Sequence, residues 1–91
     1  MDGGTDMTLK TLYPATPDDM ERLGYYGNGF LYDTDRPAWW GDVTAGGEAV
    51  TVVVAHADGR WFCEDDSGAM DGIAFGTTPE EALENWEKGK R

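Results

Sequence analysis

The fold is decided by the stretch EAVTVVVAHADGRWFCED, which occupies residues 48–65. Its first part, Glu48–Ala55, is rich in β-branched side chains and predicts the strongest strand of the chain. Asp58-Gly59 is a two-residue turn signal, so Arg60–Asp65 is expected to return antiparallel to that strand. The centre of the chain therefore predicts a β-hairpin.

The sequence leaves two registers open for this hairpin. A two-residue turn would place Trp61 opposite His56 and Cys63 opposite Val54. A three-residue turn would place Phe62 opposite Val54 instead. We favour the first register because Asp-Gly is typical of two-residue hairpin turns.

A third strand and a helix are expected to follow the hairpin. Ile73–Phe75 predicts the last strand of a meander. Thr78 suits the N-cap of the helix, Pro79 its first position, and Glu81 the capping box three residues after the cap. Gly89 is expected to end the helix. The helical spacing of apolar residues predicts a buried stripe made of Ala82, Leu83 and Trp86.

The region before the hairpin is expected to open with a strand and a short helix. Met7–Leu12 alternates apolar and polar residues, which predicts a half-buried strand ended by Pro14. Thr16 then suits the N-cap of a helix of about eight residues, which Gly24 would end. Met20 and Leu23 are expected to face inward from it.

The stretch between that helix and the hairpin is the least regular part of the sequence. Phe30–Tyr32 predicts a short strand. Residues 33–41 are expected to be irregular because Pro37 is excluded from a central strand.

These elements predict an α+β fold with a small antiparallel sheet of three to four strands and two short helices packed on it. A chain of 91 residues suits one domain, which we expect to be a thin two-layer structure. The polar, Gly-rich residues 1–6 are interpreted as a flexible leader or a cloning remnant, so the domain is expected to span residues 7–91.

The charge of the chain is its most unusual property. The formal net charge is −11, and between Asp42 and Glu87 eleven carboxylates accompany a single base, Arg60. Such a field repels nucleic acid phosphates and membrane surfaces, whereas it attracts basic protein surfaces. We therefore expect no direct binding to nucleic acid or membranes, and a partner that is a basic protein surface of a nucleic-acid-binding protein or complex. The predicted acidic face comprises Asp58, Glu64, Asp65, Asp66, Asp71, Glu80, Glu84 and Glu87, all expected to be solvated.

Four large aromatic residues fall in the two stretches expected to be loops: Tyr25, Tyr26, Trp39 and Trp40. Large aromatic side chains are common anchors at protein interfaces, which predicts a second set of partner contacts. The alternative is that they cover a thin core from outside.

The sequence offers little for catalysis. His56 and Cys63 are the only histidine and cysteine, and the favoured register would place them on one sheet face, so a Cys–His pair is conceivable. The stronger interpretation makes Cys63 a small core residue and His56 a residue near a strand end. One cysteine is too few for a structural zinc site, and Asp65–Asp71 does not match a calcium loop. We therefore expect no enzyme, cofactor or metal, and the single cysteine favours a reducing cytoplasm.

The segments Trp61–Glu64 and Gly76–Asn85 resemble the core of HicB-type antitoxin domains, in which a strand pair leads through glycine and threonine into a helix that begins Glu-Glu-Ala-Leu. The resemblance covers Val50 to Lys88. It departs from the family at Asp66–Gly72, where the family has a Pro-Gly-Cys segment, and it lacks the DNA-binding region of full antitoxins.

Similar strand–strand–helix units occur in small phage and prophage proteins, and the size and acidity of the chain are similar to those of anti-CRISPR proteins that mimic DNA. That character implies an acidic protein-binding inhibitor that competes with nucleic acid for a basic surface of its target. The alternative, implied by the HicB-like segments, is an antitoxin module that neutralises a small basic ribonuclease.

Overall fold

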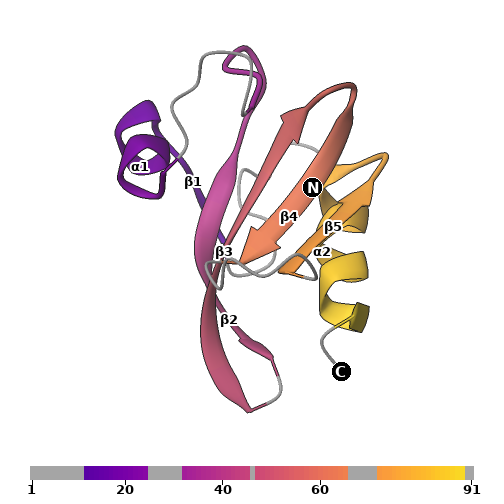
Figure 1. Cartoon of the computed structure of the whole chain (residues 1–91). Coiled ribbons are helices and arrows are strands. Elements are labelled where there is room, and N and C mark those ends of the chain that lie inside the picture. The colour runs from indigo at the N-terminus through magenta and orange to yellow at the C-terminus, as the bar shows by residue number, and fades with distance from the viewer. Residues whose placement is uncertain (1–11, 25–31, 46, 66–71, 90–91) are drawn as a thin grey trace, which may run out of the picture.

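The computed structural model of the chain describes residues 12–24, 32–45, 47–65 and 72–89. Over these residues it has an antiparallel sheet of five strands in the order β1-β2-β3-β4-β5 and two helices (Figure 1). The elements are β1 (Tyr13–Pro14), α1 (Pro17–Arg22), β2 (Trp39–Ala45), β3 (Glu48–Ala57), β4 (Arg60–Asp65), β5 (Ile73–Gly76) and α2 (Pro79–Gly89).

The α+β prediction is confirmed, with five strands in place of three to four. The additional strand is β2, in a region whose first part was expected to be irregular. It pairs with β3 along its whole length, from Trp39 opposite Val54 to Ala45 opposite Glu48. Pro37 lies before the strand and therefore does not interrupt the hydrogen-bond ladder.

The hairpin of β3 and β4 has the favoured register. His56 lies opposite Trp61 and Val54 opposite Cys63, so the three-residue alternative is wrong. Asp58 and Gly59 have φ angles of +60° and +83°. Positive φ at both central residues is the geometry of a type I′ turn, whose twist matches that of paired strands.

The first strand among the described residues includes Pro14, which was expected to end the strand before it. It is Tyr13–Pro14, and the buried residue Leu12 precedes it. The rest of the predicted strand Met7–Leu12 lies outside the described residues, as do residues 1–6. Of the predicted strand Phe30–Tyr32, only Tyr32 is described, and it is buried but not in a strand.

Helix α1 begins as predicted and ends earlier. The Thr16 side chain accepts a hydrogen bond from the main-chain N–H of Asp19 at 3.1 Å, and the Asp19 carboxylate accepts one from the N–H of Thr16 at 2.9 Å. This reciprocal capping box fixes the first turn. The helix has six residues and ends before Gly24, whose φ of +98° suits glycine.

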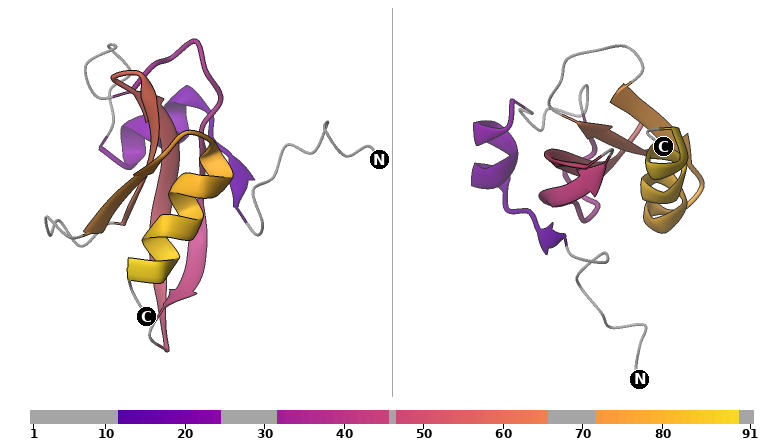
Figure 2. Two further views of the ribbon diagram at one scale, coloured as in Figure 1. Left: turned by 90° about the vertical axis from the view of Figure 1, so that its right-hand side faces the viewer. Right: turned by 90° about the horizontal axis from the view of Figure 1, so that it is seen from below.

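The two helices cover opposite faces of the sheet (Figure 2). Successive side chains of a strand point to opposite faces, so the consecutive buried residues of β3 require cover on both sides. The expected two-layer structure is therefore wrong, and the sheet is the middle of three layers. On the α2 side the buried cluster is Leu12, Trp39, Val52, Val54, Cys63, Ala82, Leu83 and Trp86, and on the α1 side it is Met20, Tyr32, Ala38, Val53, Ala55 and Phe62.

Helix α2 confirms the predicted N-cap and buried stripe. Thr78 Oγ1 accepts a hydrogen bond from the N–H of Glu81 at 3.0 Å, and Ala82, Leu83 and Trp86 are buried. The second hydrogen bond differs from that of a standard capping box. The Glu81 carboxylate accepts it from the main-chain N–H of Thr77 at 2.6 Å, one residue before the N-cap Thr78. Gly89 is the last helical residue.

Candidate partner-binding surface

The predicted acidic residues divide between the two sides of the sheet. On α2, Glu80 and Glu84 are exposed and Glu87 is half-buried. Their spacing of four and three residues places them along one side of the helix, away from the buried stripe. Asp66 and Asp71 lie outside the described residues.

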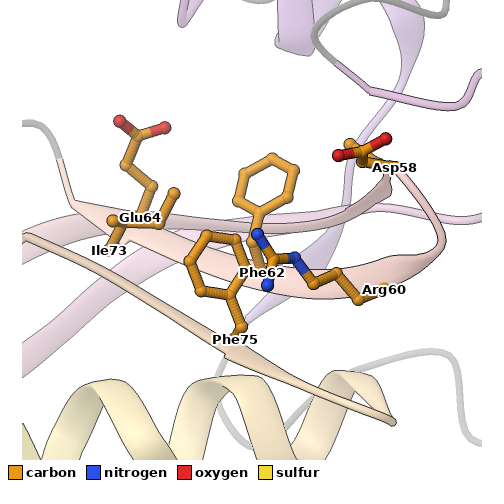
Figure 3. Close-up of a pocket in the computed structure, with 7 residues that line it drawn as sticks. Asp58, Arg60, Phe62, Glu64, Ile73 and Phe75 are labelled. Carbon is orange, nitrogen blue, oxygen red and sulfur yellow. The ribbon is translucent and has the colours of Figure 1, made fainter.

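Asp58 and Glu64 lie on the other side of the sheet, at a pocket of about 210 Å³ (Figure 3). The type I′ turn carries Asp58, whereas Glu64 belongs to β4 and pairs with Ile73 of β5. The two carboxylates stand at opposite ends of the pocket, with aromatic rings between them (Figure 3). The pocket is lined by Ala57, Asp58, Arg60, Phe62, Glu64, Ile73 and Phe75.

The aromatic rings of this pocket already contact one cation. Phe62 and Phe75 are directly opposite each other on β4 and β5. The guanidinium carbon of Arg60 lies 3.7 Å from the centre of the Phe75 ring, a cation–π contact, and Phe75 is still 39% exposed. This arrangement depends on the β4–β5 register and is therefore not predictable from the sequence pattern.

Asp65 is not part of the solvated surface, contrary to expectation. It is only 6% exposed, and its Oδ2 accepts a hydrogen bond from the indole Nε1 of Trp86 at 3.1 Å. A buried carboxylate requires such donors because burial removes its water. Asp65 therefore joins β4 to α2 and is not available to a partner as part of an acidic face.

The predicted aromatic anchors have different environments. Trp39 lies in β2 and in the core, with its ring centre 6.0 Å from that of Trp61, so its placement in a loop was wrong. Trp40 is half-buried on the other face, 6.1 Å from the ring of Tyr13, which is 60% exposed. Tyr13 was not predicted as an aromatic anchor, because the predicted strand Met7–Leu12 ends before it. Tyr25 and Tyr26 lie outside the described residues.

Cys63 is fully buried, as the preferred interpretation expected. Burial raises the pKa of its thiol, and the nearby carboxylates of Asp65, Glu87 and Glu64 raise that pKa further. A protonated, inaccessible thiol is a poor nucleophile, so the arrangement does not favour a catalytic Cys–His pair.

His56 lies near the end of β3, but it is buried and has a specific partner. Its Nδ1 is 2.5 Å from Oδ2 of Asp33, and its main-chain carbonyl accepts a hydrogen bond from the N–H of Asp33 at 2.6 Å. The ring also meets Trp61 edge-on, with centres 5.0 Å apart. These contacts hold the segment before β2 against β3, and no pattern in the sequence indicates this link.

The described residues contain neither a group of metal ligands nor a helix that could span a membrane. Within the part of the chain that the structure describes, no three His, Cys, Asp or Glu side chains are grouped so that they could hold a metal ion. Neither described helix has the length and apolar character needed to cross a membrane.

Comparisons with known proteins add no relative. No family model matches the chain, and no curated protein and no solved structure is similar to it. The fold and surface define a small, strongly acidic α+β protein with exposed carboxylates on α2 and a carboxylate-flanked aromatic pocket on the opposite face of the sheet.

Proposed function

We propose that this chain is an acidic protein-binding inhibitor of the phage or prophage type, which occupies a basic nucleic-acid-binding surface of its target. The observation that carries the proposal is the net charge of −11 combined with exposed carboxylates on both sides of the sheet. A basic groove that binds phosphates would attract this protein by the same long-range field. The cytoplasm, where such targets occur, is the proposed location.

The bases of the chain offset only part of this charge, because 7 lysines and arginines accompany 18 carboxylates. Arg22 pairs with Asp19 within α1, and Arg60 lies over the Phe75 ring. The exposed carboxylates Glu80 and Glu84 stand one helical turn apart on α2. A rigid helix that presents regularly spaced negative charges is a suitable competitor of a phosphate backbone.

The test is capture of the target from host lysate with the tagged full chain, at about 0.1 M and about 1 M salt, between which the screening length falls from about 10 Å to 3 Å. The captured protein is then purified, and its binding to duplex DNA and to RNA is measured with and without the inhibitor. We expect capture to be lost at high salt and nucleic acid binding to be blocked. The proposal would be refuted by a target whose capture is the same at both salt concentrations, or by a target that binds no nucleic acid.

A matched pair of variants separates a specific surface from bulk charge. The first variant neutralises the proposed contacts, and the second neutralises four exposed carboxylates elsewhere, with the same change in net charge. We expect about a tenfold or greater loss of affinity for the first and less than about threefold for the second. Equal losses would show that net charge alone governs binding. The substitutions are Asp58→Asn, Glu64→Gln, Glu80→Gln and Glu84→Gln in the first, and Asp18→Asn, Glu21→Gln, Asp35→Asn and Glu48→Gln in the second.

The alternative function is an antitoxin module that covers a small basic ribonuclease. The observation that favours it is the order of β3, β4, β5 and α2, in which the last strand leads through Gly76 and Thr77 into a helix packed on one face of the sheet. A neighbouring gene for a short basic ribonuclease, whose activity this chain abolishes when the two are mixed, would support it over the first proposal.

A further inference from the structure

The pocket between Asp58 and Glu64 has features that suit one kind of ligand. Its volume of about 210 Å³ is below the range of about 300–1,000 Å³ that is typical of small-molecule sites, and it is close to the needs of a single long side chain. Its apolar part is formed by Phe62, Phe75 and Ile73, and its two ends are carboxylates, while the guanidinium of the chain's own Arg60 lies over Phe75 between them (Figure 3).

We infer that this pocket binds one basic side chain, an arginine or lysine, of the protein partner. The methylene stem of such a residue would lie across the aromatic rings, as long basic side chains do on apolar surfaces. Its charged end would reach Asp58 or Glu64. The inference deepens the proposed function and rests on it, because it assigns one contact point on the basic partner.

The Arg60 contact supports this choice of ligand chemistry. Its guanidinium lies against Phe75 inside the same pocket, so an aromatic face there already stabilises a cation, and an incoming basic side chain would lie beside Arg60 or displace it. An anionic ligand could pair with Arg60, but it would also approach two carboxylates and a chain with a net charge of −11, which opposes its binding. A neutral apolar side chain would leave the carboxylates without a new partner.

The sequence provides a single probe for this pocket. Ile73 is the only isoleucine of the chain and one of the pocket's lining residues, so its δ1 methyl group gives one unambiguous signal in a methyl NMR spectrum. The full chain, labelled at this methyl, is titrated with hexa-arginine and with hexa-citrulline, which has a similar shape without the charge. We expect a saturable shift of the Ile73 signal with hexa-arginine and none with hexa-citrulline.

Two double variants then locate the contact. Asp58→Asn with Glu64→Gln neutralises the pocket, and asparagine is well suited to the positive φ of position 58. Glu80→Gln with Glu84→Gln removes the same charge from α2. The pocket variant is expected to lower the affinity for hexa-arginine, measured at the Ile73 signal, about threefold or more. The α2 variant is expected to change this affinity less than about twofold.

The outcomes separate this inference from the proposed function. The pocket inference is wrong if the Ile73 signal does not shift with hexa-arginine, or if it shifts equally with hexa-citrulline. It is also wrong if both double variants lower the affinity for hexa-arginine equally. In each case, salt-sensitive capture of a nucleic-acid-binding target could still stand. If Ile73 responds as expected but the captured target binds no nucleic acid, the pocket is supported and the proposed function is refuted.

Discussion

The indole Nε1 of Trp86 donates a hydrogen bond of 3.1 Å to Oδ2 of Asp65, which joins the middle of α2 to the last residue of β4. Both residues are buried. Asp65→Ala would leave the indole N–H buried without this acceptor, so we expect a loss of about 1–3 kcal/mol in the free energy of unfolding. Urea denaturation measures it.

Asp65→Asn is the control for this contact, because its amide oxygen can still accept the indole proton. It should lose less stability than Asp65→Ala. In the Trp86→Phe background, where the donor is absent, Asp65→Ala should cost less than in the natural chain. Equal costs in both backgrounds would show that the hydrogen bond contributes nothing.

Gly76, the last residue of β5, is expected to tolerate no side chain. A Cβ atom there would lie 2.7 Å from the main-chain nitrogen of Ala82 and 2.9 Å from the carbonyl carbon of Glu81. Because these are backbone atoms of α2, the helix itself would have to move away from the sheet. Gly76→Ala should cost about 1–3 kcal/mol in thermal or urea unfolding.

Gly89→Ala is the matched control for Gly76→Ala. A Cβ at Gly89 would meet nothing within 4 Å, and alanine has the higher helix propensity. We expect this variant to be as stable as the natural chain or slightly more stable. A Gly76→Ala protein as stable as Gly89→Ala would contradict the close packing of α2 on β5.

Glu81 should make the stability of α2 depend on pH. Its hydrogen bonds from the main chain and side chain of Thr77 hold the pKa of the carboxyl below its ordinary value of 4.5. A carboxyl group whose pKa is lower in the folded state stabilises the fold at pH values above its ordinary pKa. This contribution disappears as the pH falls through the lowered pKa. Glu81→Gln should therefore be less stable than the natural chain at pH 7, and the difference should vanish in acid.

Glu84→Gln removes the same charge from the exposed side of α2 and serves as the control. Its stability relative to the natural chain should follow pH less steeply than that of Glu81→Gln. Parallel pH profiles for the two variants would mean that the loss of charge, and not the contact with Thr77, explains the effect.

The contact between His56 and Asp33 is expected to hold the segment before β2. Asp33→Ala removes the carboxylate that lies 2.5 Å from His56 Nδ1, and the loss should be about 1–2 kcal/mol. For a domain of this size that corresponds to a fall in Tm of about 4–16 °C. Asp35→Ala, at an exposed position of the same segment, should leave Tm nearly unchanged. Similar shifts for both variants would contradict the role of the contact.

Local sequence signals were sufficient where structure is set by neighbouring residues. The Asp58-Gly59 turn fixed the β3–β4 register, and Thr78 with Pro79 fixed the start of α2. The strand β2 was not predictable in the same way, because Gly41 and Asp42 interrupt its apolar pattern and its stability comes from pairing with β3. The two glycines at 46 and 47, between runs able to form strands, were the available signal.

The candidate site was less predictable than the fold. Carboxylates on α2 follow from helical spacing, but the faces of Glu64 and Asp65 depend on which side of the sheet each helix covers. The favoured register places Asp65 on the same face as Cys63 and Trp61, but only the structure shows that α2 covers this face. The contact of Arg60 with Phe75 needed the β4–β5 pairing, which no turn signal specified.

The burial of β3 on both faces links the two halves of the chain into one cooperative unit. The C-terminal segment Val50 to Lys88 contains Val53, Ala55 and Phe62, which are covered from the side of α1. Excised alone, this segment would expose that apolar surface to water, at about 25 cal/mol per Å². We expect the whole chain to unfold in a single transition, with the amide protons of β3 the last to exchange with solvent.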